Sequence, residues 1–269
     1  MGDQFAYLRT LHDFYGDGAV LSFVEPFQRR SAFHDFIEFN IDLIVGDETT
    51  SIDLKQRKNI YKEHQARPYA FNDLTPTLFP INQAMRCYSI PHDTFEVWLK
   101  DRQKSFLQAT DDDLSEYYSD LRSEEAYEQL LDRAVGEVFF LLFPNRHLLM
   151  VFNEMMANQV TSVDNLAEIP AENRVFFRRH GILKRASIPY WVKKAVYFRY
   201  RGHCCLCLCD LSGLRSLTET ENYDHTVPLA QGGLNDVTNI QLLCKRCNHK
   251  KSSRDAVTSN LYEVWYPLT

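Results

Sequence analysis

The sequence predicts an α+β protein in two parts: a largely helical domain over residues 1–169 and a small strand-and-helix domain over residues 170–269. Three observations lead to this prediction. Apolar residues recur at three- and four-residue spacing through the first part, which is typical of amphipathic helices. Six of the seven cysteines lie in the second part. The first part carries 15 Lys and Arg against 28 Asp and Glu, whereas the second carries 15 against 8.

The bulk composition is that of a soluble globular protein, with 45% hydrophobic and 25% charged residues. The opening residues, "MGDQFAYLRT", lack the basic and apolar regions of a signal peptide. The longest aliphatic-aromatic run is "VFFLLF", far short of the roughly 20 residues that a membrane span needs. We therefore expect a cytoplasmic protein without a membrane partner. The basic second part has the right charge to bind phosphates, and the acidic first part should be repelled by them.

Four stretches of the first part predict helices, each with an apolar stripe that would pack in a core. They cover residues 31–44, 91–109, 123–143 and 147–156. The three aspartates at 111–113 are expected to open a further helix that carries Leu114 and Tyr117, because anions favour a helix N-terminus. The alternative for these aspartates is a cation site. We find no catalytic constellation before residue 170 and assign this domain to no family; a sensor, regulatory or protein-interaction role is open to it.

The polar, proline-containing residues 161–173 predict the domain boundary. A helix is then expected over residues 187–202, with Pro189 near its first turn and Gly202 near its end. This helix leads into the first cysteine cluster.

Two short cysteine motifs in the second part predict a structural zinc site. Cys204 and Cys207 form one Cys-x-x-Cys, and Cys244 and Cys247 form the other. Four thiolates suit tetrahedral zinc, and in an intracellular chain two such pairs indicate metal before disulfides. The stretch "HCCLCLC" also allows Cys205 and Cys209 as the first pair. The remaining Cys87 is expected to be a small buried residue.

The residues between and after the cysteine pairs predict a strand, a loop, a returning strand and a helix. "NYDHTVPLAQGG" indicates a strand that ends at Asp224 and His225, followed by a turn at Gly232 and Gly233. "VTNIQLLC" is typical of the returning strand. "RCNHKKSSR" then begins a helix.

The segment from about Trp191 to Arg254 resembles the HNH endonucleases, ββα-metal nucleases that carry a zinc ribbon. "VYFRYRGHCCLC" is similar to the family's lead-in helix and first cysteine pair, and "DHTVPLAQGG" to its Asp-His strand and glycine turn. "TNIQLLCKRCNHKK" is similar to the central asparagine, second cysteine pair and metal helix. Asn248 stands where the last histidine of the family's name would be, which makes this an HNN-type variant. Leu208 stands where the family commonly has glycine.

The resemblance implies metal-dependent hydrolysis of DNA phosphodiester bonds. His225 would be the general base, a role that suits an imidazole near neutral pH. Asp224 and Asn248 would hold Mg²⁺ or Mn²⁺ through oxygen atoms. Asn239 would tie the long loop across the hairpin and hold His225 in place. The alternatives are a packed or zinc-binding role for His225 and a plain turn asparagine at position 239.

Basic residues on the expected metal helix would contact substrate phosphates; these are Lys250, Lys251 and Arg254. Lys251 matches the lysine that the family carries three residues after the metal ligand, and a solvated basic face is the alternative. The expected partner is nucleic acid, above all double-stranded DNA, with protein contacts left to the first domain. HNH domains fused to unfamiliar helical domains resemble restriction or antiphage defence effectors. The rival functions are a zinc-stabilised nucleic-acid-binding or regulatory module without cleavage activity and an RNA-directed nuclease.

Overall fold

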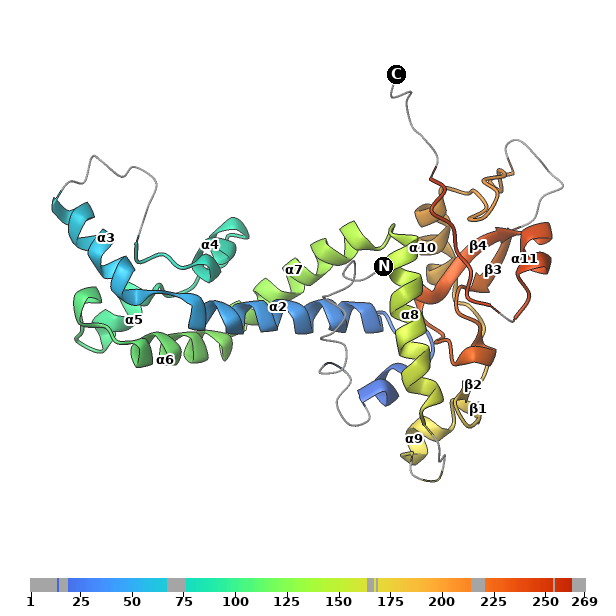
Figure 1. Ribbon diagram of the computed structural model, residues 1–269, viewed down its shortest axis with the longest axis horizontal. Coiled ribbons are helices and arrows are strands. Elements are labelled where there is room, and N and C mark those ends of the chain that lie inside the picture. The colour runs from blue at the N-terminus through green and yellow to red at the C-terminus, as the bar shows by residue number, and fades with distance from the viewer. Residues whose placement is uncertain are drawn as a thin grey trace, which may run out of the picture. The chain divides into compact units, whose positions relative to one another are not determined.

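The computed structural model describes residue 14 and residues 19–66, 76–163, 167, 169–213, 221–253 and 255–262. The chain forms two compact units (Figure 1). Unit 1 consists of Met1–Phe36 and Phe139–Thr269, and unit 2 consists of Ile37–Val138. The α+β fold class predicted from the sequence is confirmed, since most elements are helices and the strands lie toward the C-terminus.

The predicted helices of the first part are present, with one change. The helices are α2 (Ala32–Ser51), α6 (Asp111–Arg122), α7 (Glu125–Leu142) and α8 (Arg146–Thr161). The stretch 91–109 is not one helix: α5 (Phe95–Asp101) ends early and the short 3-10 helix η3 (Phe106–Gln108) follows. Gln103 has φ of 57° between them, a left-handed conformation that no α-helix can continue through. The prediction of a single helix there was wrong.

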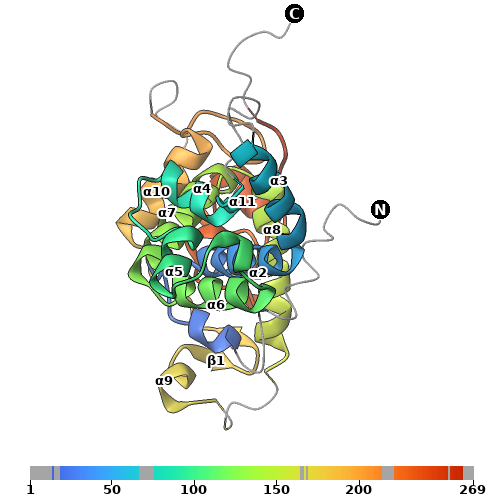
Figure 2. The ribbon, with the colours of Figure 1, turned by 90° about the vertical axis from the view of Figure 1, so that its left-hand side faces the viewer.

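Unit 2 is built around a cluster of aromatic side chains. Besides α5 and α6, it contains α3 (Leu54–Ala66) and α4 (Pro80–Cys87). Phe79, Phe95 and Tyr117 are buried with ring centroids 5.2 to 6.5 Å apart. Helices α5 and α6 lie side by side in both views (Figures 1 and 2). Cys87, at the end of α4, is exposed, so the prediction that it is buried was wrong.

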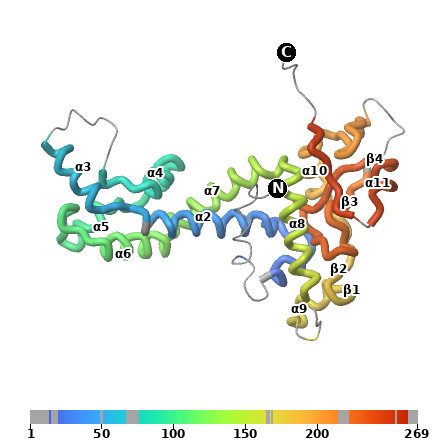
Figure 3. Tube along the Cα trace, in the orientation of Figure 1, coloured from blue at the N-terminus to red at the C-terminus, as the bar shows by residue number. Residues whose placement is uncertain are grey.

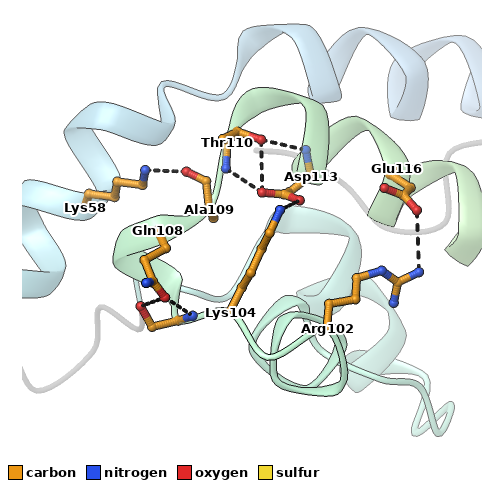
Figure 4. A network of polar contacts seen from close by, with 9 residues as sticks. Lys58, Arg102, Lys104, Gln108, Ala109, Thr110, Asp113 and Glu116 are labelled. Carbon is orange, nitrogen blue, oxygen red and sulfur yellow. Dashed lines mark hydrogen bonds and ion pairs between the residues drawn. The ribbon is translucent and has the colours of Figure 1, made fainter.

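The acidic start of α6 is a helix cap, as predicted. The hydroxyl of Thr110 accepts a hydrogen bond from the backbone N–H of Asp113 (3.2 Å), and the carboxylate of Asp113 accepts one from the N–H of Thr110 (2.8 Å). Asp113 also binds the ammonium of Lys104 at 2.6 Å. Figure 4 shows this carboxylate between its two partners. The reciprocal bonds satisfy two backbone donors that the helix cannot satisfy itself.

Unit 1 contains the elements of the basic C-terminal part. They are α9 (Ala171–Arg174), β1 (Phe177–Arg179), β2 (Ile182–Leu183), α10 (Tyr190–Tyr200), β3 (Glu221–His225), β4 (Ile240–Cys244) and α11 (Lys245–Lys251), with the short 3-10 helices η4 (Leu229–Gln231) and η5 (Val237–Asn239). Unit 1 also contains the 3-10 helix η2 (Ala19–Phe23) from the N-terminal part. Two antiparallel pairs, β1–β2 and β3–β4, make up the strands of the described residues. The β1–β2 hairpin was not expected from the sequence.

The predicted strand, loop, strand and helix are present (Figure 3). Strands β3 and β4 pair in register, with Asp224 opposite Gln241 and His225 opposite Ile240. Every residue of β4 is buried, and α10 and α11 both pack against it. Strand β3 ends at His225, as expected.

Helix α8 belongs to unit 1 because it packs on the loop between β3 and β4. The amide of Asn153, fully buried, donates to the hydroxyl of Thr238 in η5 (3.1 Å). At Gly232, which has φ of 85°, an added Cβ would lie 2.6 Å from the carbonyl oxygen of Ala157. The bounds of the compact units therefore differ from the domain boundary that the sequence predicts between residues 169 and 170. That boundary stays a prediction.

Within the described residues, no single helix is both long and apolar enough to span a membrane. The bent pair of α7 and α8 meets the length and composition criteria only when the two are taken together.

Candidate active site

Four cysteines come together at the base of the β3–β4 pair. The sulfur atoms of Cys204, Cys207, Cys244 and Cys247 all lie within 4.8 Å of one another, and those of Cys207 and Cys244 are 3.8 Å apart. Tetrahedral zinc with Zn–S bonds of about 2.3 Å requires sulfur–sulfur distances of about 3.8 Å. The four side chains therefore fit a zinc ion.

Cys204 and Cys207 are the first pair in the four-cysteine cluster. The alternative pair, Cys205 with Cys209, is not part of the cluster. The sulfur of Cys205 points elsewhere and lies 3.4 Å from the hydroxyl of Thr258. The backbone turns tightly after the pair: Leu208 has φ of 57°, and its N–H donates to the carbonyl of Cys204 (2.9 Å). Glycine adopts this left-handed conformation without strain. This explains why glycine is common at the position of Leu208 in the family that the sequence resembles.

Asp224 and His225, at the end of β3, face a cavity of about 500 Å³. The cavity is also lined by residues of the β1–β2 hairpin, of the loop after β3, and of the end of α11. Its lining residues are Arg178, Arg179, Ile182, Leu183, Arg185, Asp224, His225, Pro228, Leu229, Ala230, Lys251, Ser252 and Ser253. The predicted base and one predicted metal ligand thus share one concave site.

Asn235 fixes the tautomer of His225. The side-chain amide of Asn235 donates to the carbonyl oxygen of Lys184 (2.8 Å), so its own oxygen faces Nε2 of His225 at 3.1 Å. A carbonyl oxygen only accepts hydrogen bonds, so Nε2 must carry the proton. Nδ1 is then an unprotonated nitrogen, and it has no hydrogen-bond partner among the described residues. This is the form of imidazole that can accept a proton.

His225 is kept neutral by its surroundings. Its side chain is only 2% exposed. Burial lowers the pKa of His225 to about 4, the hydrogen bond to Asn235 raises it in part, and the positive charge of Arg185 lowers it. A neutral imidazole at neutral pH is the state that a general base requires.

Lys251 is part of the site itself. Its ammonium, which is almost fully buried, donates to a carboxylate oxygen of Asp224 (3.0 Å) and to the carbonyl oxygen of His225 (2.7 Å). These bonds join the end of α11 to the end of β3. On the other side, the guanidinium of Arg185 lies 4.0 Å from the second oxygen of Asp224. The predicted contact of Lys251 with a phosphate stays a prediction.

Asn239 ties the loop that follows β3. Its amide oxygen accepts from the N–H of Val227 (2.8 Å), and its amide nitrogen donates to the carbonyls of Val227 (3.0 Å) and Leu234 (2.9 Å). The loop closes so tightly that a Cβ at Gly233 would lie 2.1 Å from the Val227 carbonyl oxygen. Asn239 therefore holds the backbone that begins directly after His225, and it does not line the cavity.

The other site residues predicted on the metal helix are Asn248, Lys250 and Arg254, of which Asn248 and Lys250 lie outside the cavity lining that contains Lys251. Asn248 lies on α11, half-buried, one turn before Lys251 and hence on the same helix face, toward β3. It does not line the cavity, and neither does the exposed Lys250. Arg254 lies outside the described residues. The roles of these three residues stay predictions.

Sequence reasoning missed Asn235 and three arginines of the cavity, Arg178, Arg179 and Arg185. The stretch "FFRRHGILKR", residues 176–185, did carry a pattern that could have revealed the arginines: a glycine between two short apolar pairs, flanked by bases. Asn235 carried no such pattern, because its role depends on the loop that brings it back to His225.

Two antiparallel strands, a following helix and a four-cysteine cluster define a ββα domain of the zinc-ribbon type. Residues 204–254 match the family model of the HNH endonucleases. The C-terminal part of this chain is therefore an HNH domain, which indicates a nuclease that acts on nucleic acid with a divalent metal. No curated protein and no solved structure matches the chain.

Proposed function

We propose that this protein is a metal-dependent endonuclease that hydrolyses DNA phosphodiester bonds, with His225 as its general base. The observation that carries the proposal is the state of His225: buried, neutral, held by Asn235 through Nε2, and with Nδ1 left unpaired at the end of β3.

Nδ1 of His225 takes a proton from the attacking water as its oxygen bonds to phosphorus. The bond from phosphorus to the 3′ oxygen then breaks, and this oxygen gains a proton from solvent. The products carry 5′-phosphate and 3′-hydroxyl ends, as the family resemblance implies. Mg²⁺ or Mn²⁺, held by Asp224 and Asn248, would stabilise the charge that builds on the phosphate and the leaving oxygen.

Asp224 supports such a metal, because its carboxylate lines the cavity and is partly exposed. Asn248, which lies on α11 outside the cavity lining, would add an amide oxygen, as the family resemblance implies. Oxygen donors of this kind suit hard divalent cations. Lys251 holds the Asp224 side chain in one orientation through its hydrogen bond.

Incubation of the purified chain with supercoiled plasmid tests the proposal. We expect nicked or linear plasmid with Mg²⁺ or Mn²⁺, and none with a chelator. Parallel incubation with single-stranded RNA separates the DNA-directed enzyme from an RNA-directed one. Binding of plasmid without cleavage under every metal condition would favour the rival function, a nucleic-acid-binding module.

We further propose that the cleavage serves restriction or antiphage defence in the cytoplasm, with unit 2 as a sensor or protein-interaction module. Unit 2 has its own core, and residues 37–138 carry 11 Lys and Arg against 20 Asp and Glu, a charge unsuited to binding DNA. Phage plating on cells that express the chain or its His225→Ala variant tests this role. Equal plating on both would contradict it.

A further inference from the structure

The β1–β2 hairpin brings three arginines to the active-site cavity from outside the HNH family match. We define the arginine hairpin as residues 177–185, which precede the matched residues 204–254. Arg178, Arg179 and Arg185 line the same cavity as Asp224 and His225. Nothing in the family match assigns a role to this segment.

We propose that the arginine hairpin is a phosphate-binding arm that holds the nucleic-acid backbone over His225. The proposal rests on the proposed nuclease function and adds to it the residues that bind the substrate. The ligand is a phosphodiester backbone, with Arg185 at the phosphate to be cleaved and the other two arginines at neighbouring phosphates.

The charge of the cavity favours an anionic ligand. Its charged lining residues are the three arginines, Lys251 and Asp224. The ammonium of Lys251 is already bound to Asp224 at 3.0 Å, so the charges of these two residues offset each other. Arg178 and Arg179 are exposed and form no ion pair with any residue in the described part of the chain. Arg185 lies 4.0 Å from Asp224, but its side chain is 71% exposed and can reach a phosphate as well. The planar fork of each guanidinium matches two phosphate oxygens.

A strand irregularity explains how neighbouring arginines can serve one cavity. Successive side chains of a regular strand point to opposite faces. In the hairpin, Phe177 pairs with Leu183 but Arg179 pairs with Ile182, so Arg178 is an extra residue in β1. Such a bulge redirects side chains, which allows both arginines to face the cavity while Phe177 stays in the core.

The hairpin is fixed in place relative to His225. Phe177 and Leu183 are buried, and the N–H of Lys184 donates to the carbonyl of Phe176 (2.8 Å). At the turn, Gly181 has φ of 62°, and a Cβ there would lie 2.9 Å from Cα of Thr161 in α8.

Asn235 connects the hairpin to the base directly, because it binds the carbonyl of Lys184 with one end of its amide and His225 with the other. Arg185 follows Lys184 immediately and lies 4.0 Å from Asp224. A rigid arm of this kind binds phosphate without a large ordering cost.

Salt-dependent DNA binding tests the arm. The full chain with His225→Ala, which should bind but not cut, is titrated with a short DNA duplex at several KCl concentrations. The slope of log K against log[salt] is negative, and each lost phosphate contact reduces its magnitude by about 0.9. We expect a decrease of about 1 for Arg185→Gln and about 2 for the Arg178→Gln/Arg179→Gln double variant. Arg185→Lys keeps the charge and should keep the slope.

Lys194→Gln is the matched control. Lys194 is an exposed cation on α10, in the same unit, and it does not line the cavity. An unchanged slope in the arginine variants, or an equal decrease in Lys194→Gln, would overturn the arm. Plasmid cleavage by the wild-type chain is measured in parallel: if it cuts while the slopes are unchanged, the arm alone is wrong. If it does not cut with either metal, the proposed function is wrong, whatever the slopes show.

Discussion

At the scale of single residues, the proposed chemistry depends on one hydrogen bond that sets the tautomer of His225. Asn235 can hold Nε2 as a donor only because its own amide is oriented by the carbonyl of Lys184. The sequence predicted the base and its neighbour Asp224, because they are adjacent in the chain. It did not predict Asn235, ten residues away, whose position results from the loop that Asn239 closes.

Asn235→Ala should slow cleavage by roughly 10–100-fold, because a lost hydrogen bond to a buried group costs on the order of 1–3 kcal/mol. The zinc content should be unchanged. Nitrogen NMR of the His225 ring gives a second measurement: the parent should show a protonated Nε2 and the variant a mixture of tautomers. An unaltered tautomer together with an unaltered rate would show that Asn235 does not position the base.

Lys251→Met should destabilise unit 1 by about 3 kcal/mol, because it leaves Asp224 and the His225 carbonyl without their buried donor. The neighbouring Lys250→Met is the control, since Lys250 is exposed and a surface change of this kind stays within about 0.5 kcal/mol. Urea unfolding measures both. Equal stabilities would mean that the Lys251–Asp224 pair contributes nothing to the fold.

At the scale of elements, residue spacing in the sequence predicted the longer helices and strands but missed the short strands and one early helix end. The segment of β3, β4 and α11 was predicted because two cysteine pairs mark it and because each of its two strands is five residues long. The β1–β2 hairpin was missed because strands of three and two residues are too short to show an alternation. The end of α5 was missed because it depends on the left-handed turn at Gln103, for which the sequence offers no glycine.

The zinc ribbon gives an element-scale prediction. Cys244→Ala should lose zinc and unfold the β3–β4 pair, because metal binding supplies much of the folding free energy of such small sites. Cys209→Ser should retain one zinc per chain, since Cys209 is not among the four clustered cysteines. Elemental analysis of purified protein measures both. Zinc-free wild type, or zinc loss in Cys209→Ser alone, would contradict the assignment.

The first turn of α2 gives a pH prediction. His34 stacks on Phe139 with ring centroids 3.6 Å apart, and its Nδ1 lies 2.7 Å from the hydroxyl of Ser31. Burial, and then the charge of Arg30, lower the pKa of His34 from 6.5 to about 4. The unfolded chain therefore binds this proton more readily than the folded one, so the stability contribution is complete above pH 6.5 and is lost as the pH falls toward 4.

Replacement by His34→Gln should reduce this loss. The melting temperature of the wild type should fall more between pH 7 and pH 5 than that of the variant, while His225 affects both equally. Parallel melting curves across that range would contradict the role of His34.

At the scale of the whole molecule, the two compact units differ in charge and have separate cores. The HNH domain and its arginine hairpin lie in unit 1, and the acidic unit 2 has a separate aromatic core. The change of charge along the chain was visible in the sequence. The bounds of the units were not, because the membership of α8 depends on its contacts with the loop between β3 and β4.

The central claim, that this chain is a nuclease with His225 as its base, is tested most directly by comparing wild type with His225→Ala on supercoiled plasmid in Mg²⁺. The variant should keep its zinc, its fold and its affinity for DNA, because His225 is proposed to act only as the base and the phosphate contacts are proposed to come from basic side chains. Its cleavage rate should fall by on the order of 10²–10⁴, which is what a positioned base supplies. A folded, zinc-loaded His225→Ala protein that cuts plasmid at the wild-type rate would contradict the claim.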